Sequence, residues 1–442
     1  MNAREMALQV INEIIDSGAY SNIALAKKLH KSVVSEQDRR FITELVYGTV
    51  KTHKTLDYFL AKFITRKLST LSPVILNILR LGLYQILFLT KVPPSAACNQ
   101  SVELAKKYGH AGTVKFVNGV LRNMIRQQDK LTYPDPAQEP DAYLAYFYFH
   151  PLWLVQHWLK QYGFSETEAL CAANNEIPPL TLRTNTLKIT REELLKKLRD
   201  LGVVCEALTS VPEGILVTEH ASLDHLQPLQ EGFCQVQDTS SMLVAPIVDP
   251  QPGDFVIDAC SAPGGKSTHM AALMQNNGRI LAVDLHEHKL PLIEQNAKRL
   301  GISIIETLAY DATKLSKSGY EPADRVLVDA PCSGLGVLRR KSDSRWRKDP
   351  KLLQELPKLQ LEILREAARC VKPGGVLVYS TCTIETAENE AVIERFLQEE
   401  SHFVLEPAGK YLPQPTDDKV IRFFPHRDGQ DGFFIARLRR SH

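Results

Sequence analysis

The sequence has little cysteine, few aromatic residues and almost no net charge. Its 442 residues include eight cysteines, and no two of them form a C-x-x-C pair, so neither a disulfide framework nor a zinc ribbon is expected. Aromatic residues make up 7% of the chain and the formal net charge is +2. These values are typical of globular proteins, which excludes a disordered or collagen-like chain. At roughly 100–200 residues per domain, the length predicts two to four domains.

Long uninterrupted hydrophobic runs are also missing. The most apolar stretch, residues 71–92, contains Pro73, Arg80 and Gln85. Because a charged side chain is costly inside a bilayer, this stretch favours a buried helix over a membrane span. The N-terminal segment from Met1 to Ile15 is charged and helix-periodic, unlike a secretory signal. We therefore expect a cytoplasmic protein from a reducing compartment, acting as a monomer without a membrane anchor or a metal.

Residues 1–131 show helical periodicity throughout and predict an all-α domain. Residues 1–130 carry 19 Lys and Arg against 9 Asp and Glu, so this region is strongly basic. The remaining chain must then be acidic, which the near-neutral total conceals. Residues 132–145 contain several prolines and predict a linker.

The second half predicts two further domains. Residues 146–235 indicate a small α+β module, in which strand 180–184, a helix begun by a capping box at Thr190 and strand 203–208 fit a βαβ unit. Residues 236–442 alternate apolar strands with helices, a pattern typical of a doubly wound α/β sheet. The connection between strands near 420–424 and 433–438 is too short for a crossover, so we expect an antiparallel pair at the edge.

A glycine-containing loop, Cys260-Ser-Ala-Pro-Gly-Gly-Lys-Ser267, follows the first strand of this sheet and opens a helix. Such loops bind ligands against helix N-termini. The end of the motif resembles a P-loop, but Cys260 stands where a P-loop has its first glycine, which argues against an NTPase. A nucleoside-like site, approached by the backbone at Gly264 and Gly265, is the favoured interpretation.

Acidic residues end the strands that follow the loop. Asp284 follows Gly264 at the spacing, roughly 20 residues, at which dinucleotide sites place a carboxylate on ribose. Asp311 and Asp329 follow the third and fourth strands. Any one aspartate alone would be read as a helix N-cap. Acids at successive strand ends of one sheet edge favour a ligand site.

Two cysteines lie in polar turns at the ends of adjacent predicted strands. Cys332 follows Asp329-Ala-Pro, and Cys382 follows Ser380-Thr. A buried small hydrophobe is the usual interpretation of a cysteine, but these polar surroundings fit it poorly. The positive end of a following helix would favour a thiolate at either turn.

Three motifs together resemble the S-adenosylmethionine-dependent RNA cytosine-C5 methyltransferases: Ser-Ala-Pro-Gly-Gly-Lys at 261–266, Asp-Ala-Pro-Cys at 329–332 and Ser-Thr-Cys at 380–382. The basic helical region resembles a NusB-like RNA-binding domain. This combination is the layout of the bacterial 16S rRNA cytosine-C5 methyltransferase B family, also called Sun or Fmu, and the resemblance covers essentially the whole chain. It implies a Rossmann-like catalytic domain that methylates C5 of a cytosine in 16S rRNA, cytosine 967 in the family.

The resemblance also assigns roles to residues. Cytosine C5 is a poor nucleophile, so a thiolate first adds at C6 and makes C5 reactive. Cys382 is the implied nucleophile, Cys332 assists proton removal from C5 or product release, and Asp329 lies near both the cofactor and the base. The implied S-adenosylmethionine-binding residues are Cys260, Ser261, Ala262, Pro263, Gly264, Gly265, Lys266, Asp284 at the ribose, Asp311 beside the adenine, and Asp329.

A basic segment, residues 339–348, follows the Cys332 turn and combines cations with an aromatic residue. A solvated surface loop is the ordinary interpretation of such a run. Beside a site that modifies a base, we favour a loop that grips phosphates and stacks on bases. The predicted RNA contacts are Arg339, Arg340, Lys341, Arg345, Trp346 and Arg347. The turn at 425–432 is either a plain β-turn or a border of the same cleft.

Two other functions remain open from the sequence. The chain could methylate tRNA or another RNA, because only the resemblance of the helical domain points to rRNA. It could also be a non-catalytic, NusB-like RNA-binding factor. Such a factor would not need paired cysteines at neighbouring strand ends, and their presence argues against it.

Overall fold

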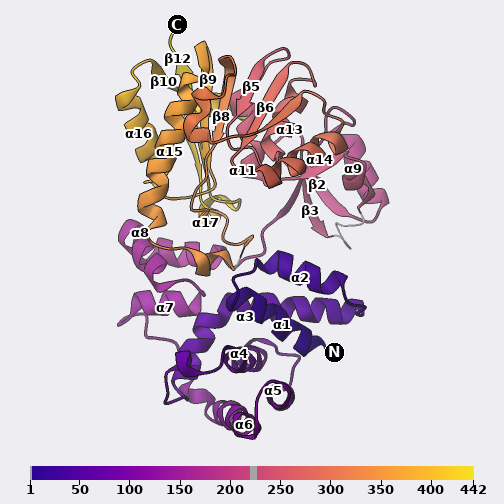
Figure 1. Ribbon diagram of the computed structural model, residues 1–442, viewed down its shortest axis with the longest axis vertical. Coiled ribbons are helices and arrows are strands. Elements are labelled where there is room, and N and C mark those ends of the chain that lie inside the picture. The colour runs from indigo at the N-terminus through magenta and orange to yellow at the C-terminus, as the bar shows by residue number, and fades with distance from the viewer. Residues whose placement is uncertain (1, 220–225, 342) are drawn as a thin grey trace. The chain divides into compact units, whose positions relative to one another are not determined.

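The computed structural model describes residues 2–219, 226–341 and 343–442 (Figure 1). The chain forms two compact units. One comprises residues 1–175 together with 341–347, and the other comprises residues 176–340 together with 348–442. The segment 132–145, expected to be a linker, belongs to the first unit and contains the start of a helix at Pro140.

The first unit is helical, as the periodicity predicts. Asn2 and Ser35 cap two of its helices by accepting hydrogen bonds from Glu5 N and Asp38 N, and Pro73 and Pro94 begin two others at positions where a proline costs no hydrogen bond. Its core consists of fully buried aliphatic and aromatic side chains from most of these helices. The helices are α1 (Ala3–Ile15), α2 (Ser21–His30), α3 (Glu36–Ala61), α4 (Pro73–Phe88), α5 (Pro94–Tyr108), α6 (Ala111–Arg126), α7 (Pro140–Phe147) and α8 (Leu152–Ala173).

The second unit begins with a four-stranded antiparallel sheet of order β2-β3-β1-β4. The capping box is confirmed, because Thr190 and Glu193 bond each other's backbone at the start of its first helix. The simple βαβ unit is wrong, since β3 lies between β1 and β2 and pairs antiparallel with both. The elements are β1 (Leu180–Thr184), α9 (Arg191–Asp200), β2 (Val204–Ala207), β3 (Gly214–Glu219), α10 (Gln227–Gln230) and β4 (Cys234–Val236).

A larger mixed sheet fills the rest of the second unit. Its order is β10-β12-β9-β8-β5-β6-β7, with β11 paired to β12. The strands are β5 (Phe255–Asp258), β6 (Arg279–Asp284), β7 (Ile305–Ala309), β8 (Ala323–Asp329), β9 (Val371–Thr381), β10 (Phe403–Glu406), β11 (Val420–Phe423) and β12 (Phe433–Arg440). The helices are α11 (Thr239–Met242), α12 (Val244–Val248), α13 (Gly265–Leu273), α14 (Leu290–Leu300), α15 (Leu352–Arg369), α16 (Glu390–Glu399) and α17 (Pro425–Asp428).

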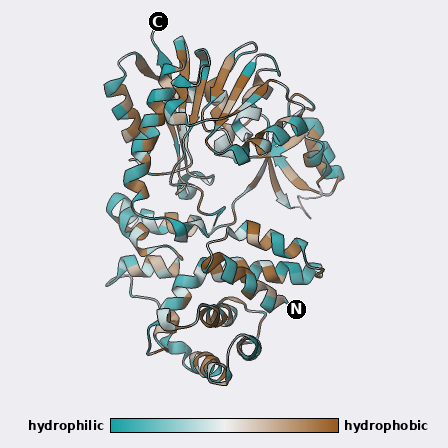
Figure 2. Cartoon of the chain, viewed as in Figure 1, coloured by the Kyte–Doolittle hydropathy of each residue, from teal (hydrophilic) through white to brown (hydrophobic). Residues whose placement is uncertain are grey.

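The larger sheet is parallel in its centre and antiparallel at one side. Strands β5 to β9 pair in parallel, and the predicted antiparallel pairing of β11 with β12 is confirmed. Strand β12 is nevertheless internal, because it also pairs with β9 and β10. The central strands are largely hydrophobic, whereas the helices carry both hydrophobic and hydrophilic residues (Figure 2). This pattern is typical of a sheet buried on both faces.

Strands β8 and β9 lie side by side in parallel, with Asp329 opposite Ser380. Their carboxyl ends therefore release the two cysteine turns at the same edge of the sheet. No helix in the described parts of the chain is long and apolar enough to cross a membrane.

Candidate active site

The predicted cofactor loop connects β5 to α13 in a conformation that requires one of its glycines. Gly264 is the N-cap of α13 and has a φ of +92°. A Cβ at this position would lie 3.1 Å from Ile293 Cγ2, so both the backbone and the packing favour glycine. A Cβ at Gly265 would meet only ordinary contact at 4.0 Å. The structure therefore requires glycine at position 264 more strongly than at position 265.

Buried polar groups fix this loop from beneath. Ser261 Oγ lies 2.5 Å from Ser267 Oγ, and Ser267 donates to Asp258 Oδ2 at 2.6 Å. Burial raises the pKa of Asp258 to about 6. Arg183 of β1 reaches the same region and donates to Gly265 O at 2.6 Å and Thr268 Oγ1 at 3.1 Å. Sequence reasoning missed Arg183, which lies in a strand that otherwise looks structural.

A cavity of about 310 Å³ opens at the carboxyl ends of β5, β6 and β8. Asp284 contributes a carboxylate that accepts from His286 N at 2.9 Å and lies 3.6 Å from Lys289 Nζ. Asp311 caps the short helix 312–317 through Thr313, as an ordinary N-cap would, and also faces the cavity. The lining residues are Ala259, Cys260, Ala262, Asp284, Leu285, His286, Lys289, Asp311, Ala312, Thr313, Asp329, Pro331, Leu359 and Ile363.

This cavity fits the expected cofactor. Apolar side chains from Leu285, Leu359 and Ile363 offer a wall for a flat base, while Asp284 offers a carboxylate for ribose hydroxyls. Burial strongly raises the pKa of Cys260, and the neighbouring aspartates act in the same direction. Cys260 is therefore a neutral thiol in the wall. In the described residues, no cluster of His, Cys, Asp and Glu could hold a metal ion.

The two cysteines of the polar turns come together as predicted. Cys332 Sγ and Cys382 Sγ lie 3.2 Å apart, and both residues are half-buried. The hydrogen bond with Cys382, together with burial, raises the pKa of Cys332 well above its usual value. The remaining cysteines, Cys260 aside, are buried in the way that small hydrophobes are.

An ion pair lies beside the thiols. Lys266 Nζ is 2.7 Å from Asp329 Oδ2, and Ser380 Oγ donates to Asp329 Oδ1 at 2.8 Å. Lys266 also lies over the Phe433 ring, 5.3 Å from its centroid. Burial disfavours the ammonium ion, but Asp329 outweighs it and raises the pKa of Lys266. Both charges are thus fixed next to the cysteines.

The predicted RNA contacts do not form one exposed patch. Arg339 is buried and donates to Asp431 at 2.7 Å. Arg340 also pairs with Asp431 and bonds Asp238 at 2.5 Å. The turn at 425–432 is therefore tied to the start of the basic segment through Asp431. Lys341 is exposed.

Three further predicted contacts, Arg345, Trp346 and Arg347, belong to the helical unit. Arg345 is fully buried and donates to Phe149 O at 3.0 Å and Asn174 O at 2.9 Å. Trp346 makes an edge contact with the ring of His53, and Arg347 donates to Gly18 O at 2.7 Å. Ser342 lies outside the described residues. These side chains have intramolecular partners, and their contact with RNA stays a prediction.

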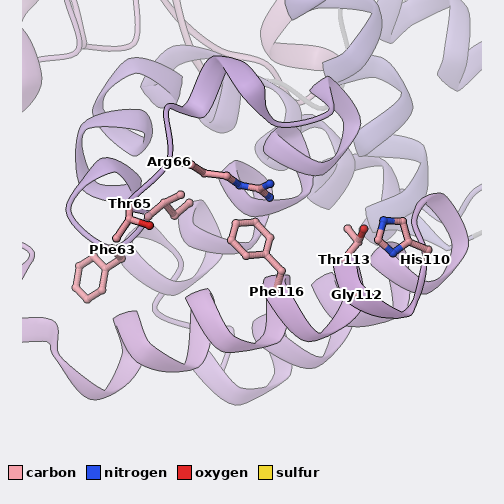
Figure 3. Close-up of a pocket in the computed structure, with 8 residues that line it drawn as sticks. Phe63, Thr65, Arg66, His110, Gly112, Thr113 and Phe116 are labelled. Carbon is pink, nitrogen blue, oxygen red and sulfur yellow. The ribbon is translucent and has the colours of Figure 1, made fainter.

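A second cavity, of about 430 Å³, lies in the helical unit (Figure 3). Arg66 lies over the ring of Phe116, with its guanidinium carbon 4.6 Å from the centroid. Phe63 and His110 also border this cavity. A cation beside aromatic rings is a suitable surface for an unstacked nucleotide.

Comparison with known proteins matches all three parts of the chain to family models. Residues 1–126 match the NusB family, residues 150–224 match the ferredoxin-like domain of RsmF/B-like methyltransferases, and residues 245–439 match the 16S rRNA methyltransferase RsmB/F model. The fold and the site thus define a Rossmann-like methyltransferase joined to a NusB-like helical domain.

Relatives that match over their full length indicate which family of methyltransferases this chain belongs to. The chain is 41% identical to "Probable ribosomal RNA small subunit methyltransferase B" of Bacillus subtilis, over 100% of this chain and 99% of that protein. It is 34% identical to "Ribosomal RNA small subunit methyltransferase B" of Enterobacter sp., over 99% and 98%. The chain belongs to the RsmB/F family of 16S rRNA methyltransferases.

Solved structures share the fold of this chain. The structure described as "Crystal Structure of PH0851" aligns with a TM-score of 0.83 and 30% identity, covering 99% of each chain. The structure of NSun6 from Pyrococcus horikoshii with SFG aligns with a TM-score of 0.61 and 26% identity, covering 66% of this chain and 98% of that one.

Proposed function

We propose that this protein transfers the methyl group of S-adenosylmethionine to C5 of a cytosine in 16S rRNA. The observation that carries the proposal is the pair of sulfurs, 3.2 Å apart, at the ends of adjacent parallel strands. A cavity suited to a nucleoside lies at the same edge, and Asp329 belongs to both the cavity wall and the ion pair beside the thiols. Family membership supports rRNA as the substrate.

In this mechanism Cys382 acts as the nucleophile. Its thiolate adds to C6 of the cytosine, and the electron pair moves into the ring to make C5 nucleophilic. The bound cofactor supplies an electrophilic methyl group on a sulfonium. Protonation of, or a hydrogen bond donated to, N3 of the cytosine would support addition at C6, and the Asp329 carboxyl group is assigned this role. Cys332 then assists removal of the C5 proton, or release of the product as the Cys382 thiolate leaves C6.

The helical domain contributes RNA affinity in this proposal. Its excess of positive charge attracts phosphates without regard to sequence. The Arg66 and Phe116 cavity adds a place where an unpaired base could stack. The target cytosine must leave its stack to expose C5 and C6, so contacts to flanking nucleotides are expected.

Methyl transfer to purified RNA tests the proposal directly. The full chain, labelled S-adenosylmethionine and unmodified 16S rRNA should give labelled 5-methylcytosine, and tRNA in parallel should give little. Label in tRNA alone would favour a tRNA enzyme. Label in neither RNA would overturn the enzymatic proposal and favour an RNA-binding factor.

A further inference from the structure

A buried carboxylate, Glu388, bonds both cysteine-bearing turns. Its side chain accepts from Ser333 N at 2.8 Å and from Ser333 Oγ, the residue directly after Cys332. It also accepts from Thr383 Oγ1 at 3.2 Å, the residue directly after Cys382. The two hydroxyls lie 2.8 Å from each other. One carboxylate therefore connects two turns that are 50 residues apart in the sequence, each directly after one of the two cysteines.

Neighbouring side chains complete this connection. Asn389 bonds the residues on both sides of Cys382: its Oδ1 accepts from Thr381 Oγ1 at 2.6 Å and its Nδ2 donates to Thr383 O at 3.0 Å. Gln360 of α15 donates to Pro331 O at 3.0 Å and to Glu388 at 2.9 Å. The backbone on both sides of each sulfur is thus fixed by buried hydrogen bonds, which gain strength in a low-dielectric interior.

The charges around the two sulfurs differ. The donors that the structure gives to the Glu388 carboxylate are neutral: a backbone amide, two hydroxyls and a side-chain amide. The hydrogen bond with Cys382 and burial raise the pKa of Cys332, and the nearby Glu388 carboxylate acts in the same direction. On the other side, the ammonium of Lys266 attracts negative charge on Cys382. Asp258, Cys260, Asp329 and Tyr379 are further titratable groups around this cluster, and Tyr379 donates to Glu388 O at 2.6 Å.

We propose that Glu388 is a positioning residue that helps make Cys382, and not Cys332, the nucleophile. It holds the two turns so that the sulfurs meet, and its charge helps keep Cys332 as a thiol that donates to a Cys382 thiolate. This inference rests on the proposed two-cysteine mechanism, and it adds a second group, beside Lys266, that makes two chemically identical side chains unequal.

Alkylation of the full-length protein by iodoacetamide, without RNA, measures this inequality. Only the thiolate reacts at an appreciable rate, so initial rates at each cysteine, read by peptide mass spectrometry between pH 7 and 9, report its ionisation. We expect Cys382 to react at least about tenfold faster than Cys332, since one unit of pKa difference gives about tenfold. In Glu388→Gln, which removes the charge but keeps the shape, we expect Cys332 to react about tenfold faster than in the wild type.

Two further variants separate charge from packing. Glu390→Gln changes the nearby carboxylate that pairs with Arg422 at 2.8 Å, and should leave the ratio of the two rates unchanged. Ser333→Ala removes one hydrogen bond to Glu388 and keeps its charge. We expect it to lower methyl transfer several-fold while the ratio of the two alkylation rates stays as in the wild type, whereas Glu388→Gln should change that ratio; a purely structural role of Glu388 would leave the ratio unchanged in both variants.

Each outcome bears on the proposal. Faster reaction of Cys332 than of Cys382 in the wild type would overturn it, even if Glu388→Gln did not fold. An unchanged rate ratio in a folded Glu388→Gln would also overturn it. The expected alkylation order without any methyl transfer to RNA would instead reject the proposed function and leave the ordering of the two thiols in place.

Discussion

The two units of the chain arrange their polar groups in different ways. In the second unit, buried polar side chains converge at the carboxyl ends of three neighbouring strands, where Asp258, Asp329 and Glu388 each have assigned donors. In the helical unit, a buried charge such as Arg80 is paired locally, 2.8 Å from Asp57. Residues 1–130 carry a net charge of +10, so the rest of the chain carries −8 to give the total of +2. A reaction that makes and breaks bonds requires several polar side chains at one place. Attraction to RNA requires only an excess of positive charge.

The largest expected effect comes from removing the nucleophile of the convergent site. Cys382→Ala should lower methyl transfer by more than about a thousandfold, because it removes the thiolate that adds to C6 and makes C5 reactive. Cys332→Ala should instead let a covalent protein–RNA adduct accumulate, visible as a shifted band on a denaturing gel. An active Cys382→Ala, or an adduct formed by that variant alone, would reverse the assignment of the two thiols.

Acid should affect the two units in opposite directions. Burial raises the pKa of Asp258 from 3.8 to about 6, so its contribution to stability is present at low pH and is lost as the pH rises from about 4 to 6. Burial lowers the pKa of His53 from 6.5 to about 4, so its contribution is present above pH 6.5 and is lost as the pH falls toward 4. Each shift corresponds to about 3 kcal/mol.

Urea unfolding of Asp258→Asn and His53→Gln between pH 4 and 7 tests whether the two residues change the free energy of unfolding in opposite directions with pH. Relative to the wild type, Asp258→Asn should gain stability as the pH rises and His53→Gln should gain it as the pH falls. Tryptophan fluorescence follows the helical unit, because all three tryptophans (Trp153, Trp158 and Trp346) belong to it. Circular dichroism follows both units. Equal slopes for the two variants would contradict the burial argument.

Cofactor affinity should depend on the second unit alone. Asp284→Ala should weaken S-adenosylmethionine binding by about tenfold to 150-fold, because a hydrogen bond to a charged group contributes roughly 1.5–3 kcal/mol and each 1.4 kcal/mol is a factor of about ten. RNA affinity should not change. Asp311→Asn is the matched comparison: it keeps an oxygen that can accept from Thr313 N, 3.0 Å away in the wild type, and the substitution should cost less affinity. Calorimetry measures the cofactor, and filter binding measures the RNA; an equal loss in both would refute the separation.

The smallest effect is expected in the helical unit. Arg66→Ala should weaken RNA binding by about threefold to tenfold and reduce the slope of log affinity against log salt by about one unit. Lys317→Ala, which removes an exposed cation from the second unit, should change affinity less. Titrations at several salt concentrations distinguish the two. An equal loss of RNA affinity in Lys317→Ala and Arg66→Ala would show that cations of the helical unit contribute no more to RNA binding than other exposed cations.

Local signals made much of the fold predictable. The helix begun by Thr190 follows from its capping box, and the helical unit follows from apolar periodicity. The sequence pattern does not predict strands β3 and β4, because short strands are stabilised mainly by pairing with neighbouring strands. Strand β3, for example, pairs with both β1 and β2. The internal position of β12 likewise depends on β9 and β10, which no local pattern reveals.

The candidate site likewise contains residues that local sequence patterns predict and residues that they do not. Cys332, Cys382 and Asp329 could be predicted to meet, because parallel strands release their carboxyl ends at one edge. Glu388 could not, since it lies in a turn beyond β9 and bonds a serine 55 residues away. The basic segment was ambiguous for a different reason. Cations and an aromatic residue look the same in sequence whether they face RNA or, like Arg345, bond carbonyl oxygens of the same chain.

That segment has a consequence for how the protein is made. Residues 341–347 belong to the helical unit, yet the ribosome adds them only after most of the second unit, from position 176 to position 340, has been synthesised. At roughly 5–20 residues per second, the partners of Arg345 wait roughly 10–30 seconds for it. Until then the carbonyl groups of Phe149 and Asn174 lack the donor that they have in the finished protein. The N-terminal unit is therefore synthesised first but completed late, and a stall or truncation before residue 341 would leave it without these hydrogen bonds.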